Sequence, residues 1–252
     1  MKRILILLGV LTSLTAAHIV FGQTAEGVIT YEVKVNMHRR LPPERAEMKT
    51  MIPEFRISKQ QLFFKGHESL YKPLIEDDDE ETTTSHGGEG GGTRVVMRMP
   101  NVEIYLDQNS SVVLSKQEFM GKEYLIQDSV KVSPWKFGTE YKTIQGYECK
   151  QAYYTDNSRP DRKQEITAWY TDKIKPFLGP ERFNTLPGAV LAVDVNNAER
   201  IMLATMIEMR SLKKNELKVP SGGQKTTQAE FRKMVDEQVK QMGGSGGVII
   251  RN

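Results

Sequence analysis

Hydrophobic and polar residues alternate along most of this chain, and an alternation with a period of two is typical of β-strands that bury one face. Residues 27–37 show it most clearly, because Ile29, Tyr31 and Val33 are separated by positions such as Glu32. Further runs that are rich in β-branched and aromatic residues occupy residues 55–65, 68–71, 93–99, 101–106, 111–119, 123–127, 141–154, 165–171, 189–195 and 200–210. Such a series predicts an antiparallel sheet of about nine to twelve strands.

Short polar segments separate these runs and predict tight turns between neighbouring strands. Gln145-Gly146 lies between two strand-like runs, and the glycine can adopt the positive φ that a two-residue hairpin needs. Gly66-His67 is the corresponding turn after residues 55–65. Residues 189–195 form an almost continuous apolar run, which predicts a strand that is covered on both faces.

Two segments carry helical signals instead. Residues 42–51 begin with prolines and an acidic first turn, so they predict a short helix. Residues 226–242 gather their apolar side chains on one helical face, and Thr226 or Thr227 can cap the start. We expect this helix to dock on the sheet or to contact a partner protein. The predicted fold is mainly β (α+β): a single curved antiparallel sheet or half-barrel with one short helix and one C-terminal amphipathic helix.

The beginning of the chain predicts export. Lys2 and Arg3 precede a short apolar stretch and then small residues, as in a secretory signal peptide. We place cleavage between Gly22 and Gln23, and a retained membrane anchor is the alternative. The predicted organisation is a signal peptide at 1–22, an antiparallel β domain at 23–212, a linker at 213–225, an amphipathic helix at 226–242 and a flexible tail at 243–252.

Charge and cysteine content narrow the possible partners and the cellular location. Loss of the signal peptide lowers the formal net charge from +3 to +1, which argues against nucleic acid as a partner. Cys149 is the only cysteine, so no lipoprotein attachment site follows the signal, and we expect it to be a small buried residue. We therefore expect an exported protein that is periplasmic, outer-membrane-associated or extracellular, is not a lipoprotein and has no transmembrane segment after signal cleavage.

An ordered series of motifs runs through the central strands. In chain order it reads Trp135-Lys136, Ile144-x-Gly146-Tyr147-x-Cys149-x-x-Ala152, Ala168-Trp169-Tyr170-Thr171 and Gly179-Pro180-x-x-Phe183-x-x-Leu186-Pro187-Gly188. The series resembles the GLPGLI family, which consists of secreted proteins of Bacteroidetes-type bacteria with no established activity. The namesake hexapeptide of that family begins with glycine and ends in Leu-Ile, whereas this chain has Thr185 and Ala189-Val190 at those places.

The resemblance implies no catalytic residues, and we interpret its last motif as a structural turn. The residues concerned are Gly179, Pro180, Phe183, Leu186, Pro187 and Gly188. Pro187 can set the first central position of a type II turn, and Gly188 can supply the positive φ at the second. Because the family has glycine where this chain has Thr185, the change Thr185→Gly is expected to cost little stability.

Two features suggest metal binding as an alternative. Residues 76–92 carry seven acidic residues and five glycines, so they predict a mobile solvated loop that could hold a cation with His86 as a further ligand. Met97 and Met99 lie two apart on one strand face, and paired thioethers can bind copper(I). The acidic loop lacks the spacing of a calcium-binding loop, and methionines also simply fill cores.

No acid, base or nucleophile pattern is present, so the sequence predicts a non-enzymatic cell-envelope protein that needs no cofactor. We expect it to bind an apolar ligand in the concavity of the sheet or an outer-membrane partner protein. The alternatives are a protein that handles copper or a divalent cation, and a hydrolase whose site is assembled only in the fold.

Overall fold

The computed structural model describes residues 26–41, 43–75, 101–158 and 163–243. Twelve strands form a single sheet. In chain order they are β1 (Glu26–Asn36), β2 (Phe55–Lys65), β3 (Glu68–Pro73), β4 (Val102–Asp107), β5 (Val112–Phe119), β6 (Lys122–Ser129), β7 (Lys136–Ile144), β8 (Tyr147–Asp156), β9 (Gln164–Thr171), β10 (Ala189–Val195), β11 (Arg200–Glu208) and β12 (Gln224–Thr227).

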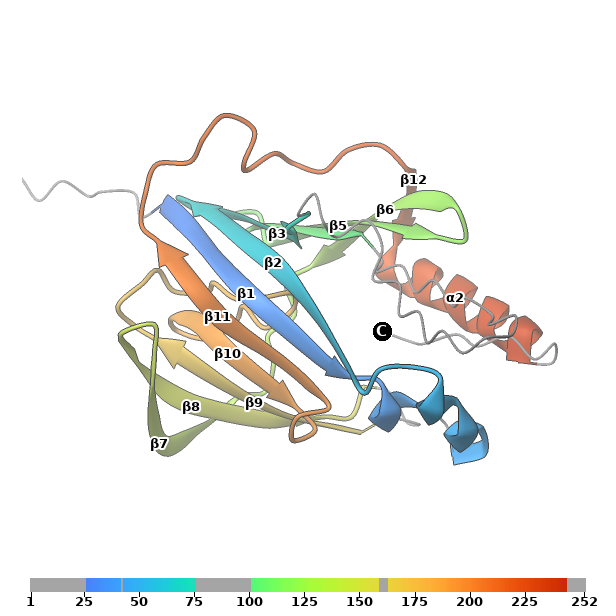
Figure 1. Cartoon of the computed structure of the whole chain (residues 1–252). Coiled ribbons are helices and arrows are strands. Elements are labelled where there is room, and N and C mark those ends of the chain that lie inside the picture. Colours follow the sequence, from blue (N-terminus) through green and yellow to red (C-terminus); the bar gives the residue numbers. More distant parts are fainter. Residues whose placement is uncertain (1–25, 42, 76–100, 159–162, 244–252) are drawn as a thin grey trace, which may run out of the picture.

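The strand order in the sheet is β12-β6-β5-β4-β3-β2-β1-β11-β10-β9-β8-β7. Its two ends are not joined, so the sheet is open rather than a closed barrel, and Figure 1 shows how strongly it bends along its length. All neighbouring strands are antiparallel except β12, which runs parallel to β6. The prediction of a mainly β fold built on one curved sheet is confirmed.

The predicted hairpin turns are present. Gln145 and Gly146 join β7 to β8 with φ values of 49° and 80°, so both central residues have the positive φ of a type I′ turn. Gly66, with a φ of 55°, lies in the turn between β2 and β3. The strand register at these places is therefore set by turn residues that can be identified in the sequence.

The core lies along the middle of the sheet, where β1, β9, β10 and β11 meet. Every residue of β10 except Asp194 is buried, as the continuous apolar run predicts. The Tyr31 hydroxyl of β1 donates a 2.7 Å hydrogen bond to the Val190 carbonyl of β10, two strands away in the sheet. Large side chains fill this region, and the fully buried ones include Tyr31, Phe64, Leu178, Phe183, Leu186 and Leu191.

Three helical segments of the described residues accompany the sheet. The predicted short helix is a 3-10 helix, η3 (Pro43–Thr50), and it follows one turn of the same type, η2 (His38–Arg40). The amphipathic helix is α2 (Gln228–Gly243). Phe231 of α2 packs edge-to-face against Phe119 and Tyr124, with ring centroids 5.9 and 5.2 Å away. The helix therefore docks on β5 and β6, at the end of the sheet that β12 borders (Figure 1).

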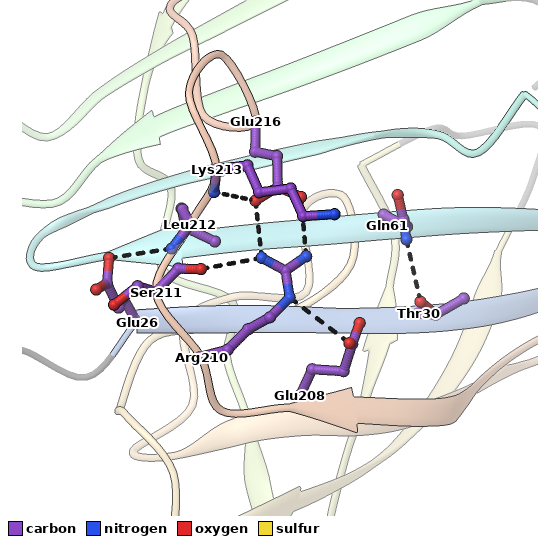
Figure 2. A network of polar contacts seen from close by, with 9 residues as sticks. All are labelled: Glu26, Thr30, Gln61, Glu208, Arg210, Ser211, Leu212, Lys213 and Glu216. Atoms are coloured by element: carbon purple, nitrogen blue, oxygen red, sulfur yellow. Dashed lines mark hydrogen bonds and ion pairs between the residues drawn. The ribbon is translucent and has the colours of Figure 1, made fainter.

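The segment after β11 crosses from the middle of the sheet to its edge (Figure 1). Arg210 makes two hydrogen bonds of 2.9 and 2.8 Å to the Glu216 carboxylate, which also accepts the Lys213 backbone N–H (Figure 2). The Leu212 N–H donates to Glu26 at the start of β1. These contacts fold the first part of the crossing segment back on itself and attach it to the sheet.

The predicted linker at 213–225 is wrong at its end, because residues 224–227 form β12. The strand was missed because Gln224, Lys225, Thr226 and Thr227 have no apolar alternation. β12 is an edge strand, and its residues are mostly exposed, so parallel pairing with β6 rather than burial holds it in place.

Several predictions fall outside the described residues. They are the signal peptide at 1–22, the acidic loop at 76–92, the strand at 93–99 and the tail after residue 243. Within the parts that are described, no helix is both long and apolar enough to cross a bilayer.

Candidate functional surface

One face of β7, β8 and β9 gathers aromatic and charged residues at the open edge of the sheet. Phe137 of β7 lies opposite Ala152 of β8, and Tyr141 lies opposite Lys150. Lys150 in turn lies opposite Tyr170 of β9. Directly opposed residues share a face, and so do residues two apart on one strand. These side chains therefore all project from the same side of the sheet, which we call the aromatic edge face: Phe137, Tyr141, Lys150 and Tyr170, with Asp172 just beyond β9.

The two aromatic rings on β7 are largely in solvent. Phe137 is 61% exposed and Tyr141 is 63% exposed, whereas Tyr170 beside them is buried. Phe137 packs edge-to-face on Tyr170, with ring centroids 6.1 Å apart. Ala152 and Tyr170 belong to the main core cluster. The aromatic edge face is thus the outer continuation of a core face, and it is left open where the sheet ends.

An ion pair lies among these rings. The Lys150 Nζ is 2.7 Å from the Asp172 Oδ2, and both side chains are almost half exposed. The hydrogen bond between them raises the pKa of Lys150 and lowers the pKa of Asp172. Burial, the largest cause, raises the pKa of Tyr170, which keeps its hydroxyl protonated. At neutral pH the face therefore offers an ammonium group, a carboxylate and a neutral phenol.

The opposite face of the same strands has a different character. Tyr153 lies there, opposite Lys136 and Thr167, and is 43% exposed. Lys142 lies over the Trp169 ring at 4.4 Å from its centroid. Trp169 is 8% exposed, so its ring is covered.

The predicted turn motif lies in the connection between β9 and β10. Phe183 and Leu186 are buried in the main core cluster, and Gly179 and Pro180 are buried beside them. The Val190 N–H donates to the Leu178 carbonyl at 2.8 Å, and the Phe177 N–H donates to the Leu186 carbonyl at 3.1 Å. The connection therefore folds onto the core and begins directly after Asp172 of the aromatic edge face.

The predicted type II geometry at Pro187-Gly188 is wrong, because Gly188 does not have a positive φ. The reason for glycine is space. A Cβ on Gly188 would come closer than 3.0 Å to the Thr171 carbonyl and to the Tyr170 ring. Gly179 is equally confined, since its Cβ would meet the Phe183 backbone. Both glycines permit close approach of backbones rather than a left-handed conformation.

The expectation that Thr185→Gly costs little stability did not include the contacts of the Thr185 side chain. The Trp135 indole N–H donates a 3.0 Å hydrogen bond to the Thr185 Oγ1, and the Ser133 N–H approaches the same oxygen at 3.4 Å. Trp135 packs edge-to-face on Tyr154, with ring centroids 4.6 Å apart. Thr185 thus fixes the segment that leads into β7, where the aromatic edge face begins.

The predicted metal ligands Met97, Met99 and His86 lie outside the described residues. Among the residues that are described, no group of three or more His, Cys, Asp or Glu side chains is arranged to hold a metal ion.

Two places could suggest catalysis, and neither has the required geometry. Cys149 is fully buried, as predicted, and burial raises the pKa of its thiol to about 11, which disfavours the nucleophilic thiolate. The His67 Nε2 lies 3.7 Å from the Asp107 Oδ1, beyond hydrogen-bonding distance. Ser110 bonds to the same aspartate rather than to the histidine, so no base activates its hydroxyl.

Sequence reasoning missed the aromatic edge face. The predicted strand run begins at Tyr141, and Phe137 lies before it. Neither ring stands out in the sequence, because aromatic side chains are common in buried strands. Phe137 and Tyr141 alternate with polar positions of β7, as in a strand that buries one face, so the sequence pattern gives no sign of their exposure. The register of β7 against β8 shifts between these two residues, and their partners Ala152 and Lys150 lie on the same face of β8.

No family model matches the chain, and no curated protein matches it, so the resemblance to the GLPGLI family stays a prediction. Two crystal forms of a protein named PNGF-II have a similar fold, with a TM-score of 0.56 and 15% sequence identity in each. The alignments cover 84% of this chain and 34% and 33% of those chains. This chain therefore spans about a third of the solved chains that it matches, and the likeness concerns the fold alone.

Proposed function

We propose that this protein is an exported, non-enzymatic binding protein of the cell envelope that attaches to an envelope component through the aromatic edge face. The observation that carries the proposal is the exposure of Phe137 and Tyr141 on a face that elsewhere forms the core. Exposed aromatic rings beside polar groups are typical of interaction surfaces. The predicted secretory signal and the GLPGLI-like motifs support a location in the envelope.

The packing of the core favours surface attachment over an enclosed apolar ligand. The interior is filled by protein side chains, since Tyr31, Phe64 and Leu191 are fully buried. The connection between β9 and β10 adds Leu178 to the same cluster as these three residues. An apolar ligand would have to displace these side chains, which costs packing energy.

Binding to isolated envelopes tests the proposal. Purified protein without its signal peptide is mixed with envelope fragments of the source cells and sedimented, and the bound fraction is measured. We expect the wild-type protein to sediment with the fragments and the double variant Phe137→Ala/Tyr141→Ala to stay in solution. Both rings are mostly exposed, so the double variant should keep the wild-type unfolding temperature.

Tyr153→Ala is the matched control, because it removes an exposed tyrosine from the opposite face of the same strands. It should sediment like the wild type. Equal sedimentation of the double variant and the wild type would contradict the proposal. Co-purification of a lipid, detected by native mass spectrometry, would favour the enclosed apolar ligand instead.

A further inference from the structure

We infer that the aromatic edge face binds a neutral carbohydrate chain. This inference rests on the proposed function and gives the chemical class of the envelope component. It is carried by two exposed aromatic rings and a hydrogen-bonding ion pair that project from the same face of three adjacent strands: Phe137 and Tyr141 as the rings, and Lys150 with Asp172 as the pair.

The rings suit a sugar because of their electrostatics and shape. An aromatic face carries partial negative charge, and it attracts the weakly positive C–H groups on the flat side of a pyranose. Tyr170 holds the Phe137 ring by an edge-to-face contact, so part of the platform is ordered before binding. Preordering reduces the entropy that binding must overcome, which matters most for a shallow, exposed surface.

The ion pair suits hydroxyl groups. Each sugar hydroxyl can donate one hydrogen bond and accept others, and Asp172 offers acceptors while Lys150 offers donors. Adjacent hydroxyls can therefore contact both members of the pair, whose oxygen and nitrogen lie 2.7 Å apart. Almost half of each side chain is exposed, so both groups keep free hydrogen-bonding capacity toward solvent.

The same pair disfavours the competing ligands. Asp172 pairs with Lys150 at 2.7 Å and, more loosely, with Lys173 at 3.8 Å. The Lys173 side chain is 75% exposed, so solvent screens its charge, and a phosphate or a uronic acid gains little at this face. A proline-rich peptide could stack on the rings, but proline has no N–H, so its prolines would donate no hydrogen bond to the free acceptor positions of the Asp172 carboxylate. Only a ligand that presents both donors and acceptors matches the whole face.

Titration with soluble saccharides tests the inference. Cellotetraose and chitotetraose are added separately to the protein without its signal peptide, and backbone resonances are followed by two-dimensional NMR. A decaproline peptide serves as the competing probe. We expect shifts confined to β7, β8, β9 and the residues after Thr171 with at least one saccharide. Tyr141→Ala should weaken that binding by about tenfold, as expected for one stacked ring, and Tyr153→Ala should leave it unchanged.

Other outcomes overturn the inference. They are shifts with neither saccharide, shifts that lie away from β7–β9, or an equal loss of binding in Tyr153→Ala. Binding of decaproline in place of the saccharides, with the same dependence on Tyr141, would identify a protein partner. If the saccharides fail while envelope sedimentation still depends on Phe137 and Tyr141, only the carbohydrate assignment falls and the proposed function stands.

Discussion

At the scale of single residues, close contacts in the connection between β9 and β10 position the aromatic edge face. Gly188 lets this connection press against Thr171 at the end of β9. Thr185 receives the Trp135 indole, which precedes β7. Neither residue belongs to the face itself. Gly188 contacts the residue before Asp172, and Thr185 bonds to the residue two positions before Phe137. Both residues therefore hold the strands that carry the face.

The change Gly188→Val tests the first contact. The new side chain would collide with the Thr171 carbonyl, so we expect a loss of about 1–3 kcal/mol in the free energy of unfolding. Urea unfolding provides the measurement, and Pro187→Ala, at an exposed neighbouring position, is the control. Wild-type stability of Gly188→Val would show that the connection can move away at no cost.

The change Thr185→Gly tests the second contact. It removes the hydrogen-bond acceptor of the Trp135 indole, and we expect a loss of about 1–2 kcal/mol in the free energy of unfolding. Thr185→Ser keeps the hydroxyl and should restore most of that loss in the same urea experiment. If the serine and glycine variants were equally unstable, the hydroxyl would not be the cause.

Residue-scale predictions from the sequence succeeded where local chemistry decides the conformation. Gln145-Gly146 forms the expected turn, and Cys149 is buried as expected. They did not include the contacts of Thr185 and Gly188, because the partners of those residues, Trp135 and Thr171, come from other parts of the chain. Single-sequence patterns contain no information on such contacts.

At the scale of elements, the crossing segment after β11 depends on ionised side chains. Hydrogen bonds from Arg210, the largest cause, lower the pKa of Glu216 to about 2 from an ordinary value of 4.5. A carboxyl whose pKa is lowered in the folded state stabilises that state above its ordinary pKa. The stabilisation is lost as the pH falls from 4.5 toward 2, because the group then becomes protonated.

The change Glu216→Gln is therefore expected to reduce the dependence of stability on acid pH. At neutral pH the variant should be less stable than the wild type, since the neutral amide that replaces the carboxylate cannot pair with the Arg210 charge. As the pH falls below about 4.5 the difference between the two should shrink. Urea unfolding across the acid range measures it, and a difference that is constant with pH would contradict the role of the ion pair.

Helix α2 is attached to the sheet mainly through one aromatic residue, Phe231, which packs on Phe119 and Tyr124. Phe231 is the buried residue of α2 in the small cluster with Tyr124 and Ile126, which is separate from the main core. We expect Phe231→Ala to speed amide hydrogen exchange in α2 and to leave β8–β10 unchanged. Lys233→Ala, at an exposed position of the same helix, is the control. Equal acceleration in β8–β10 would show that the helix and the sheet unfold together.

Most elements could be predicted because the period of hydrophobic residues and the residue types in turns are local properties of the sequence. The strands from β1 to β11, apart from β7, and helix α2 fall near their predicted places. β7 begins at Lys136, whereas the predicted run begins at Tyr141. β12 could not be predicted, since a polar four-residue strand gains its place only by pairing with β6. The aromatic edge face was missed for a related reason: its exposure depends on β7 being the last strand of the sheet.

At the scale of the whole molecule, the two edges of the sheet differ in how far other elements cover them. At one edge, β12 pairs with β6, and α2 packs beside it. At the other edge, β7 has no further strand beside it among the described residues, and its aromatic rings are exposed. An unprotected edge strand with exposed aromatic rings promotes aggregation, so we expect such an edge to be kept only where it serves binding. The asymmetry of the sheet thus supports attachment at β7.

Chemical footprinting of tyrosines tests this claim most directly. Tyr141 and Tyr153 are both exposed, lie on adjacent strands and project from opposite faces, so each is an internal reference for the other. The protein is nitrated alone and after binding to envelope fragments, and each site is quantified by mass spectrometry. We predict that binding protects Tyr141 and leaves Tyr153 reactive. Equal reactivity of Tyr141 in the free and bound protein, or protection of Tyr153 instead, would contradict attachment through the aromatic edge face.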